Sequence, residues 1–160
     1  MPDCAYASIE LGGRIPKAAI DELEAAATND GAYLEDDDYS KLSLADALAL
    51  AAAREDTISL VNEEASWGEL DEIISICEQF GIPYRHANTE RYEISNVVKY
   101  FDGEGASETI NATSGDLDPC VTVSTLGEAL RAGETLAAVY AKYAKFIEPL
   151  PPIIVTDDEE

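Results

Sequence analysis

The chain has 160 residues, of which 46% are hydrophobic, and its 33 acidic and 10 basic side chains give a formal net charge of −23. This length suits one domain with a core of its own, and this apolar content argues against wholesale disorder. The charge excludes nucleic acid and anionic membrane surfaces as ligands, because both are polyanions. A basic protein would instead be attracted to this chain.

The N-terminus lacks a basic segment followed by a long apolar run, and no apolar stretch reaches the length of a membrane span. We therefore expect no secretory signal and no membrane helix. The cysteines, Cys4, Cys77 and Cys120, are widely spaced, which is typical of a protein without disulfides in a reducing cytoplasm. We predict a cytoplasmic location, and we expect Cys77, on an apolar helix face, to be buried.

The first part of the chain predicts a strand, a helix and a second strand. Residues 4–11 alternate in polarity as a strand does, and two glycines follow them. Apolar residues then recur at helical spacing over residues 19–27, and the Asn-Asp-Gly sequence at 29–31 predicts the end of that helix. Residues 32–34 can form a short strand. After them, Ser43 and Asp46 make a capping pattern before a short Ala-rich helix.

The stretch from residue 57 to residue 87 repeats the order strand, helix, strand. A β-type run at 58–61 precedes a capping-box pattern formed by Ser66 and Glu69. Apolar residues at positions 70, 73, 74 and 77 share one helix face. A glycine and an Ile-Pro-Tyr segment then predict the helix end and the next strand.

Residues 7–34 and 58–84 therefore share one order of elements. They are either a degenerate βαβ repeat or two unrelated units of the same kind, and the sequence favours neither explanation. Two such units can build a four-stranded sheet with both helices on one face, the ferredoxin-like arrangement. We predict an α+β fold in which two βαβ units form one mixed sheet with helices on one face, together with a β-hairpin and a C-terminal helix.

The remaining elements follow residue 96. Residues 97–112 predict the hairpin, and Val121 and Val123 can form a short strand. Thr125 and Glu128 match a capping box, and residues 134–147 have a strongly amphipathic helical pattern. We expect residues 1–148 to form one domain and residues 149–160 to form a Pro-rich, acidic tail.

The apolar face of the helix at 134–147 has two interpretations. It closes the domain core over the sheet, which is our first expectation, or it forms a dimer seam. The surrounding stretch is less acidic than the rest of the chain, so like-charge repulsion between two copies is smallest there. A homodimer would therefore use residues 134–155.

The sequence contains no catalytic, metal or cofactor motif. His86 is the only histidine, and no nucleophile is predicted beside it. The acids and cysteines lack metal-binding spacing, and the glycines near residue 12 lack a phosphate-binding pattern. We predict no catalytic residue, metal or cofactor. An alternative is a small enzyme or ligand-binding domain with a site near His86, built from Tyr84, His86, Arg91 and Tyr92.

The distribution of charge is the most informative feature of the sequence. Eight acids and no base lie between Lys17 and Lys41, and eight more acids without a base lie between Arg54 and Arg85. Rows of carboxylates on a rigid domain can imitate a phosphate backbone. The acids that we expect to bind a partner are Asp21, Glu22, Glu24, Glu35, Asp36, Asp37, Asp38, Glu63, Glu64, Glu69, Asp71 and Glu72.

In class and charge the chain resembles small phage and plasmid inhibitors of restriction or CRISPR systems, which are acidic mimics of nucleic acid. This likeness implies a non-enzymatic protein that occludes a basic, nucleic-acid-binding partner and binds no nucleic acid or membrane itself. The alternative is a halophilic housekeeping domain, because a salt-rich cytoplasm favours acidic surfaces with few lysines, and this chain has five.

Overall fold

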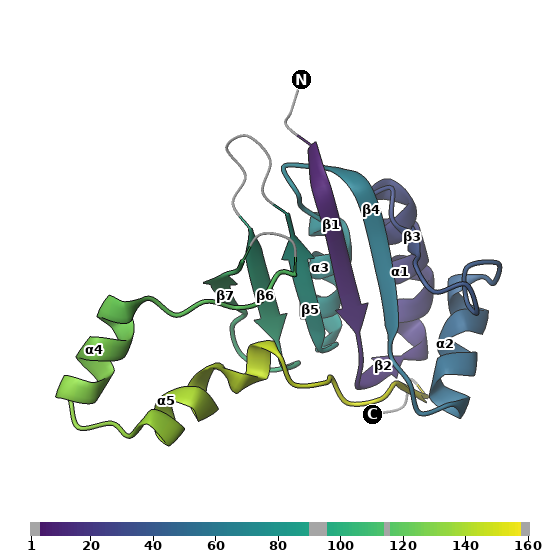
Figure 1. Ribbon diagram of the computed structural model, residues 1–160. Helices are drawn as coiled ribbons and strands as arrows, with labels where there is room; N and C mark the ends of the chain where they lie inside the picture. The colour runs from purple at the N-terminus through teal and green to yellow at the C-terminus, as the bar shows by residue number, and fades with distance from the viewer. Residues whose placement is uncertain (1–3, 90–95, 114–115, 158–160) are drawn as a thin grey trace.

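A computed structural model describes residues 4–89, 96–113 and 116–157 as one sheet-based unit with a projecting helical arm (Figure 1). Its elements are β1 (Cys4–Leu11), β2 (Arg14–Pro16), α1 (Lys17–Asn29), β3 (Tyr33–Leu34), α2 (Leu44–Ala53), β4 (Ile58–Ser66), α3 (Asp71–Phe80), β5 (Tyr84–Asn88), β6 (Val97–Phe101), β7 (Glu108–Asn111), α4 (Val123–Arg131), α5 (Leu136–Tyr143), the 3-10 turn η1 (Ala144–Phe146) and β8 (Ile154–Thr156). None of the described helices is long and apolar enough to cross a membrane.

The main sheet has the strand order β3-β4-β1-β5-β6-β7. Each neighbouring pair is antiparallel. The two strands of each predicted βαβ unit are not neighbours, because β4 lies between β1 and β3, and β1 lies between β4 and β5. The α+β class and the β6–β7 hairpin are confirmed. The expectation of a mixed sheet is wrong for this main sheet, since the parallel pairing in the described residues joins β2 to β8 in a separate small sheet.

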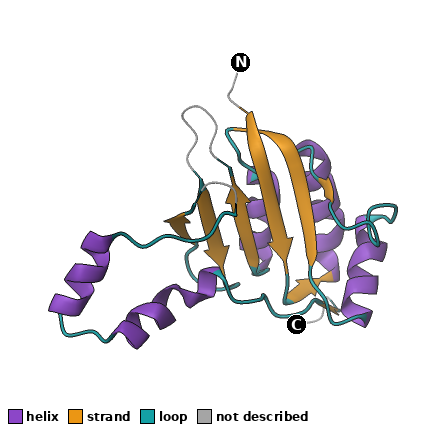
Figure 2. Cartoon of the chain, in the orientation of Figure 1, coloured by secondary structure: helices purple, strands orange, loops and turns teal. Residues whose placement is uncertain are grey.

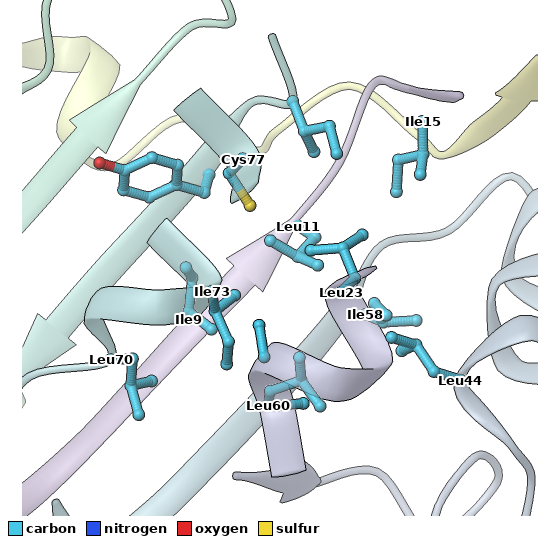
Figure 3. Packing of buried hydrophobic residues seen from close by; sticks show 14 of the residues in the cluster. Ile9, Leu11, Ile15, Leu23, Leu44, Ile58, Leu60, Leu70, Ile73 and Cys77 are labelled. Carbon is cyan, nitrogen blue, oxygen red and sulfur yellow. The ribbon is translucent and has the colours of Figure 1, made fainter. Parts of the chain in front are cut away.

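The core lies between the sheet and the helices α1, α2 and α3, which cover one face of the sheet (Figure 2). Strand β1 alternates strictly, with Ile9 and Leu11 fully buried on the helix side. Figure 3 shows Leu23 of α1 and Ile73 of α3 pointing into the same space as Leu11. Cys77 is buried there as expected, and its burial raises the pKa of the thiol.

Helix α3 does not begin with the predicted capping box. Ser66 ends β4, and the backbone then turns through Trp67 and Gly68, both with positive φ, so that the Glu69 amide donates to the Ser66 carbonyl rather than to its side chain. Asp30, beside the C-terminal end of α1, accepts a hydrogen bond from the Ile73 amide at 2.9 Å. Asp30, which follows the last residue of α1, therefore caps α3 and positions it against α1.

Of two further helix starts, the sequence patterns predicted the cap of α2 correctly and the cap of α4 incorrectly. Ser43 caps α2 as predicted, because its side chain accepts from the Asp46 amide at 3.1 Å. The capping box predicted at Thr125 is wrong, because Thr122 is the N-cap of α4 and its side chain accepts a hydrogen bond from the Thr125 amide. Val123 consequently begins a helix, and the short strand expected around it does not form.

Helices α4 and α5 project from the sheet as an arm (Figure 2). The predicted helix at 134–147 is shorter, since α5 ends at Tyr143 and a 3-10 turn follows. Val139 and Phe146 are buried, but Leu136 is 65% exposed and Tyr140 is 63% exposed. The expectation that this whole apolar face closes the core is therefore wrong for its outer half.

The chain after the arm returns along the sheet as a strap, residues 147–157 (Figure 1). Leu150 and Ile153 are buried, and β8 pairs with β2. Gly12 allows this approach, because a Cβ atom there would lie 2.4 Å from the Pro151 carbonyl oxygen. Most of the segment expected as a tail thus packs on the sheet unit.

Candidate functional site

All twelve acids predicted to bind a partner are exposed, but the fold divides them into separate groups. One group lies on α1 and at the start of α3. A second group is the loop 35–38, held beside the end of α2 by an ion pair between Asp38 and Arg54 at 3.1 Å. Glu63 lies apart from both groups on β4, where it accepts a hydrogen bond from the hydroxyl of Tyr33.

The helix group brings together acids that are far apart in sequence. Glu22 of α1 and Glu72 of α3 line the same groove, which has a volume of about 340 Å³. Asn29 donates to the Glu72 carboxylate at 2.8 Å and ties the two helices together at one end of the groove. The first helical residue of α3 is Asp71, so Glu69 precedes the helix and does not share a helix face with Glu72.

A second candidate site is a cavity of about 270 Å³ near His86. Of its lining, sequence reasoning assigned only His86 to this site, and it named the two lining acids, Glu69 and Asp71, as partner-binding residues. The lining residues come from the β4–α3 turn, α3 and three strands, and they are Trp67, Glu69, Asp71, Ile74, His86, Asn88, Val97, Lys99 and Thr109.

Strand register explains why these side chains meet. His86 of β5 pairs with Lys99 of β6, and Lys99 pairs with Thr109 of β7, so the three point to the same face of the sheet. Of the other residues proposed for this site, Tyr84 is buried outside the lining and donates to Glu78 at 2.7 Å. Arg91 and Tyr92 lie outside the described residues.

The cavity perturbs two of its titratable groups. Burial lowers the pKa of His86, and the Lys99 ammonium lowers it further, although the ring Nδ1 lies 2.9 Å from the Ser8 carbonyl oxygen. Burial raises the pKa of Glu69, and the Asp71 carboxyl, which shares a hydrogen bond with it, raises it further. The site thus favours a neutral His86 imidazole, and the Glu69 carboxyl retains a proton more readily than an isolated acid.

The described part of the lining contains no cysteine or serine beside the imidazole. Among the described residues, no group of three or more His, Cys, Asp or Glu side chains could hold a metal ion.

Comparison with protein-family models, with curated proteins and with solved structures finds no significant match for the chain. Any functional statement must therefore come from the residues of the chain itself.

The pH dependence of stability should report the state of His86. Because its folded pKa is lowered, neutral His86 stabilises the fold fully above the ordinary value of 6.5, and this stabilisation is lost as the pH falls below it. We expect the free energy of unfolding to drop by about 1.4 kcal/mol for each pH unit between the two pKa values.

The measurement is urea unfolding of the wild type and of His86→Gln at several pH values from about 7.5 to about 5. Lys99 and Asp71, which face the ring, remain in both proteins, so the difference between the two curves isolates the imidazole. Identical pH dependence in the two proteins would contradict a depressed pKa.

Proposed function

We propose that the chain is a non-enzymatic binding protein whose anionic surface engages a basic, nucleic-acid-binding protein. The observation that carries this proposal is the exposure of all twelve acids, with those of α1 and α3 gathered on one packed pair of helices. Exposed carboxylates without interspersed lysines are poor contributors to the chain's own stability, since like charges repel. They suit a surface that meets a cationic partner.

The mechanism would be competitive occlusion. A partner that normally holds a phosphate backbone would instead hold carboxylates fixed on helices and on a tethered loop. An inhibitor of restriction or CRISPR proteins is the class that fits this chemistry best. No disulfide joins the described cysteines, Cys4, Cys77 and Cys120, to one another, which is compatible with action in a reducing cytoplasm.

Competition against nucleic acid tests this proposal. A labelled DNA duplex is bound to a defined restriction or CRISPR nuclease, and the chain is added at rising salt. We expect displacement of the duplex, with the affinity of the chain for the nuclease falling about tenfold or more between about 0.05 and 0.2 M salt. A complex that is equally tight at both salt concentrations would reject the electrostatic mechanism.

The same salt series addresses the halophilic alternative. A domain adapted to a salt-rich cytoplasm should unfold at low salt, because its self-repulsion is then unscreened. Circular dichroism at about 0.05 M salt distinguishes the two explanations. A chain that folds only in about molar salt would favour the housekeeping alternative.

A homodimer through residues 134–155 is a second proposal, and the exposed half of α5 favours it. Leu136, Tyr140 and Ile147 border an apolar groove of about 320 Å³ on the arm. Residues 121–147 contain two acids and three bases, so two arms would meet with little repulsion.

A further inference from the structure

A tryptophan in an unfavourable backbone conformation lines the cavity near His86. Trp67 has φ +57°, a value that a bulky side chain rarely adopts, and its side chain is 47% exposed. Gly68 follows with φ +68° and packs against the Asn88 side chain. Backbone strain of this kind persists only where the surrounding structure fixes the residue, and it is frequent at binding sites. Here the strained residue places an aromatic ring at the cavity.

Two carboxyl groups lie on the wall next to this ring. Glu69 and Asp71 both line the cavity and are close enough to share a hydrogen bond. Two adjacent carboxylates repel one another unless a proton or a cation lies between them. A bound cation would therefore remove this repulsion.

The floor of the cavity is polar but carries little positive charge. His86 and Asn88 are each only 4% exposed. The His86 Nδ1 carries the ring proton, because the Ser8 carbonyl oxygen at 2.9 Å can only accept. Since burial lowers the pKa of this ring, it remains neutral near neutral pH and does not repel a cation.

Lys99 is the one cationic side chain among the described residues of the lining, and its charge is partly balanced. Its Nζ lies 3.8 Å from a Glu78 oxygen outside the cavity. The lining therefore contributes two carboxyl groups against one paired ammonium, within a chain of net charge −23. An anionic ligand would face the carboxyl pair and the field of the whole chain.

We propose that this cavity binds an organic cation, namely an alkylammonium or guanidinium group. The cation would contact the Glu69 and Asp71 carboxylates and the face of Trp67, an arrangement in which aromatic rings attract cations. The volume of about 270 Å³ is just below the range of drug-sized ligand sites, so it suits a short aliphatic amine or one side chain. The cation can come from a free small amine or from a lysine or arginine of a protein partner.

This site does not require the wider anionic surface to be a partner-binding surface. A monovalent probe at constant ionic strength reports on the cavity alone, whereas DNA displacement reports on the surface. Failure of either proposal therefore leaves the other open to its own test.

The chain provides two built-in probes, because it has one tryptophan and one histidine and both line the cavity. Trp67 fluorescence and the His86 imidazole NMR signals are followed while n-butylammonium, methylguanidinium or the blocked peptide acetyl-Gly-Lys-Gly-amide is added. The neutral isostere of n-butylammonium, n-butanol, serves as the control ligand. We expect a saturable change in both signals with the cations and none with the alcohol.

The variant Glu69→Gln, Asp71→Asn should bind the cations about tenfold more weakly or worse, since it removes both charged acceptors. Glu128→Gln with Glu134→Gln is the matched control, because it also removes two charges, from exposed acids of the arm that do not line the cavity. It should change the affinity less than about twofold. Trp67→Asn, which tolerates positive φ, should weaken binding as read from the His86 signals.

Tight binding of the lysine peptide would identify a protein side chain as the source of the cation, and binding of the free amines alone would identify a small metabolite. Both results support the proposal. Equal weakening by the arm control and the cavity variant, or the absence of a saturable change with any cation, would overturn it.

Discussion

Replacing Phe146 with alanine is expected to lower the free energy of unfolding by about 3 kcal/mol or more, as for other large buried aromatic residues. Phe146 is only 4% exposed, and its ring meets Tyr100 of β6 edge-on with the centroids 6.3 Å apart. This contact joins the base of the arm to the sheet face opposite α1 and α3. Urea unfolding followed by circular dichroism measures the loss.

Tyr140→Ala is the matched control, because Tyr140 lies on the same arm but is 63% exposed. We expect it to change the free energy of unfolding by no more than about 0.5 kcal/mol. If the exposed face forms a dimer, light scattering should show a smaller particle for this variant. A Phe146→Ala protein as stable as the wild type would contradict the packing of the arm base on the sheet.

Neutralising Glu22 and Glu72 together should weaken displacement of DNA from the proposed nuclease partner by about tenfold or more, since two charge-assisted contacts are lost. These acids line one groove although they belong to different helices. Glutamine is the replacement of choice at both positions, because the amide oxygen introduced by Glu72→Gln can still accept the hydrogen bond from Asn29. The half-maximal concentration for displacement measures the effect.

Glu128→Gln with Glu134→Gln is the matched control, because it changes the net charge equally on exposed positions of the arm. It should shift the half-maximal concentration less than about threefold. Equal weakening by both pairs would show that net charge alone, and not the surface of α1 and α3, governs binding.

Local patterns predicted the parts of the fold that depend on a single element. Ile9 and Leu11 follow the alternation of a strand, and Leu23 and Ile73 follow the period of a helix, so their burial could be expected from spacing alone. Capping was less predictable. Ser43 caps α2 as expected. Asp30, however, caps a helix that begins 41 residues later, and a contact between such distant residues leaves no local signal in the sequence.

The two candidate sites could be predicted from the sequence only where they depend on single residues or single elements. Acids are rarely buried, so the exposure of residues such as Glu22 and Asp37 could be expected from composition. Their division into groups could not, because it depends on strand order and helix packing. The cavity depends on the register that pairs His86 with Lys99, and on the turn that places Trp67 beside them. Neither the register nor the turn follows from spacing within one element.

The pairing of β8 with β2 affects the order in which this fold can assemble. The neighbouring ion pair between Lys17 and Asp157 joins residues 140 positions apart, so the loop to be closed is nearly as long as the described chain. Closing it costs entropy that is recovered only after the intervening strands have found their places. Residues 153–155 line an apolar groove together with residues of α1 and α2. During synthesis on a ribosome this groove would therefore stay uncovered until residues 153–155 emerge, and until then its apolar side chains would be accessible to chaperones.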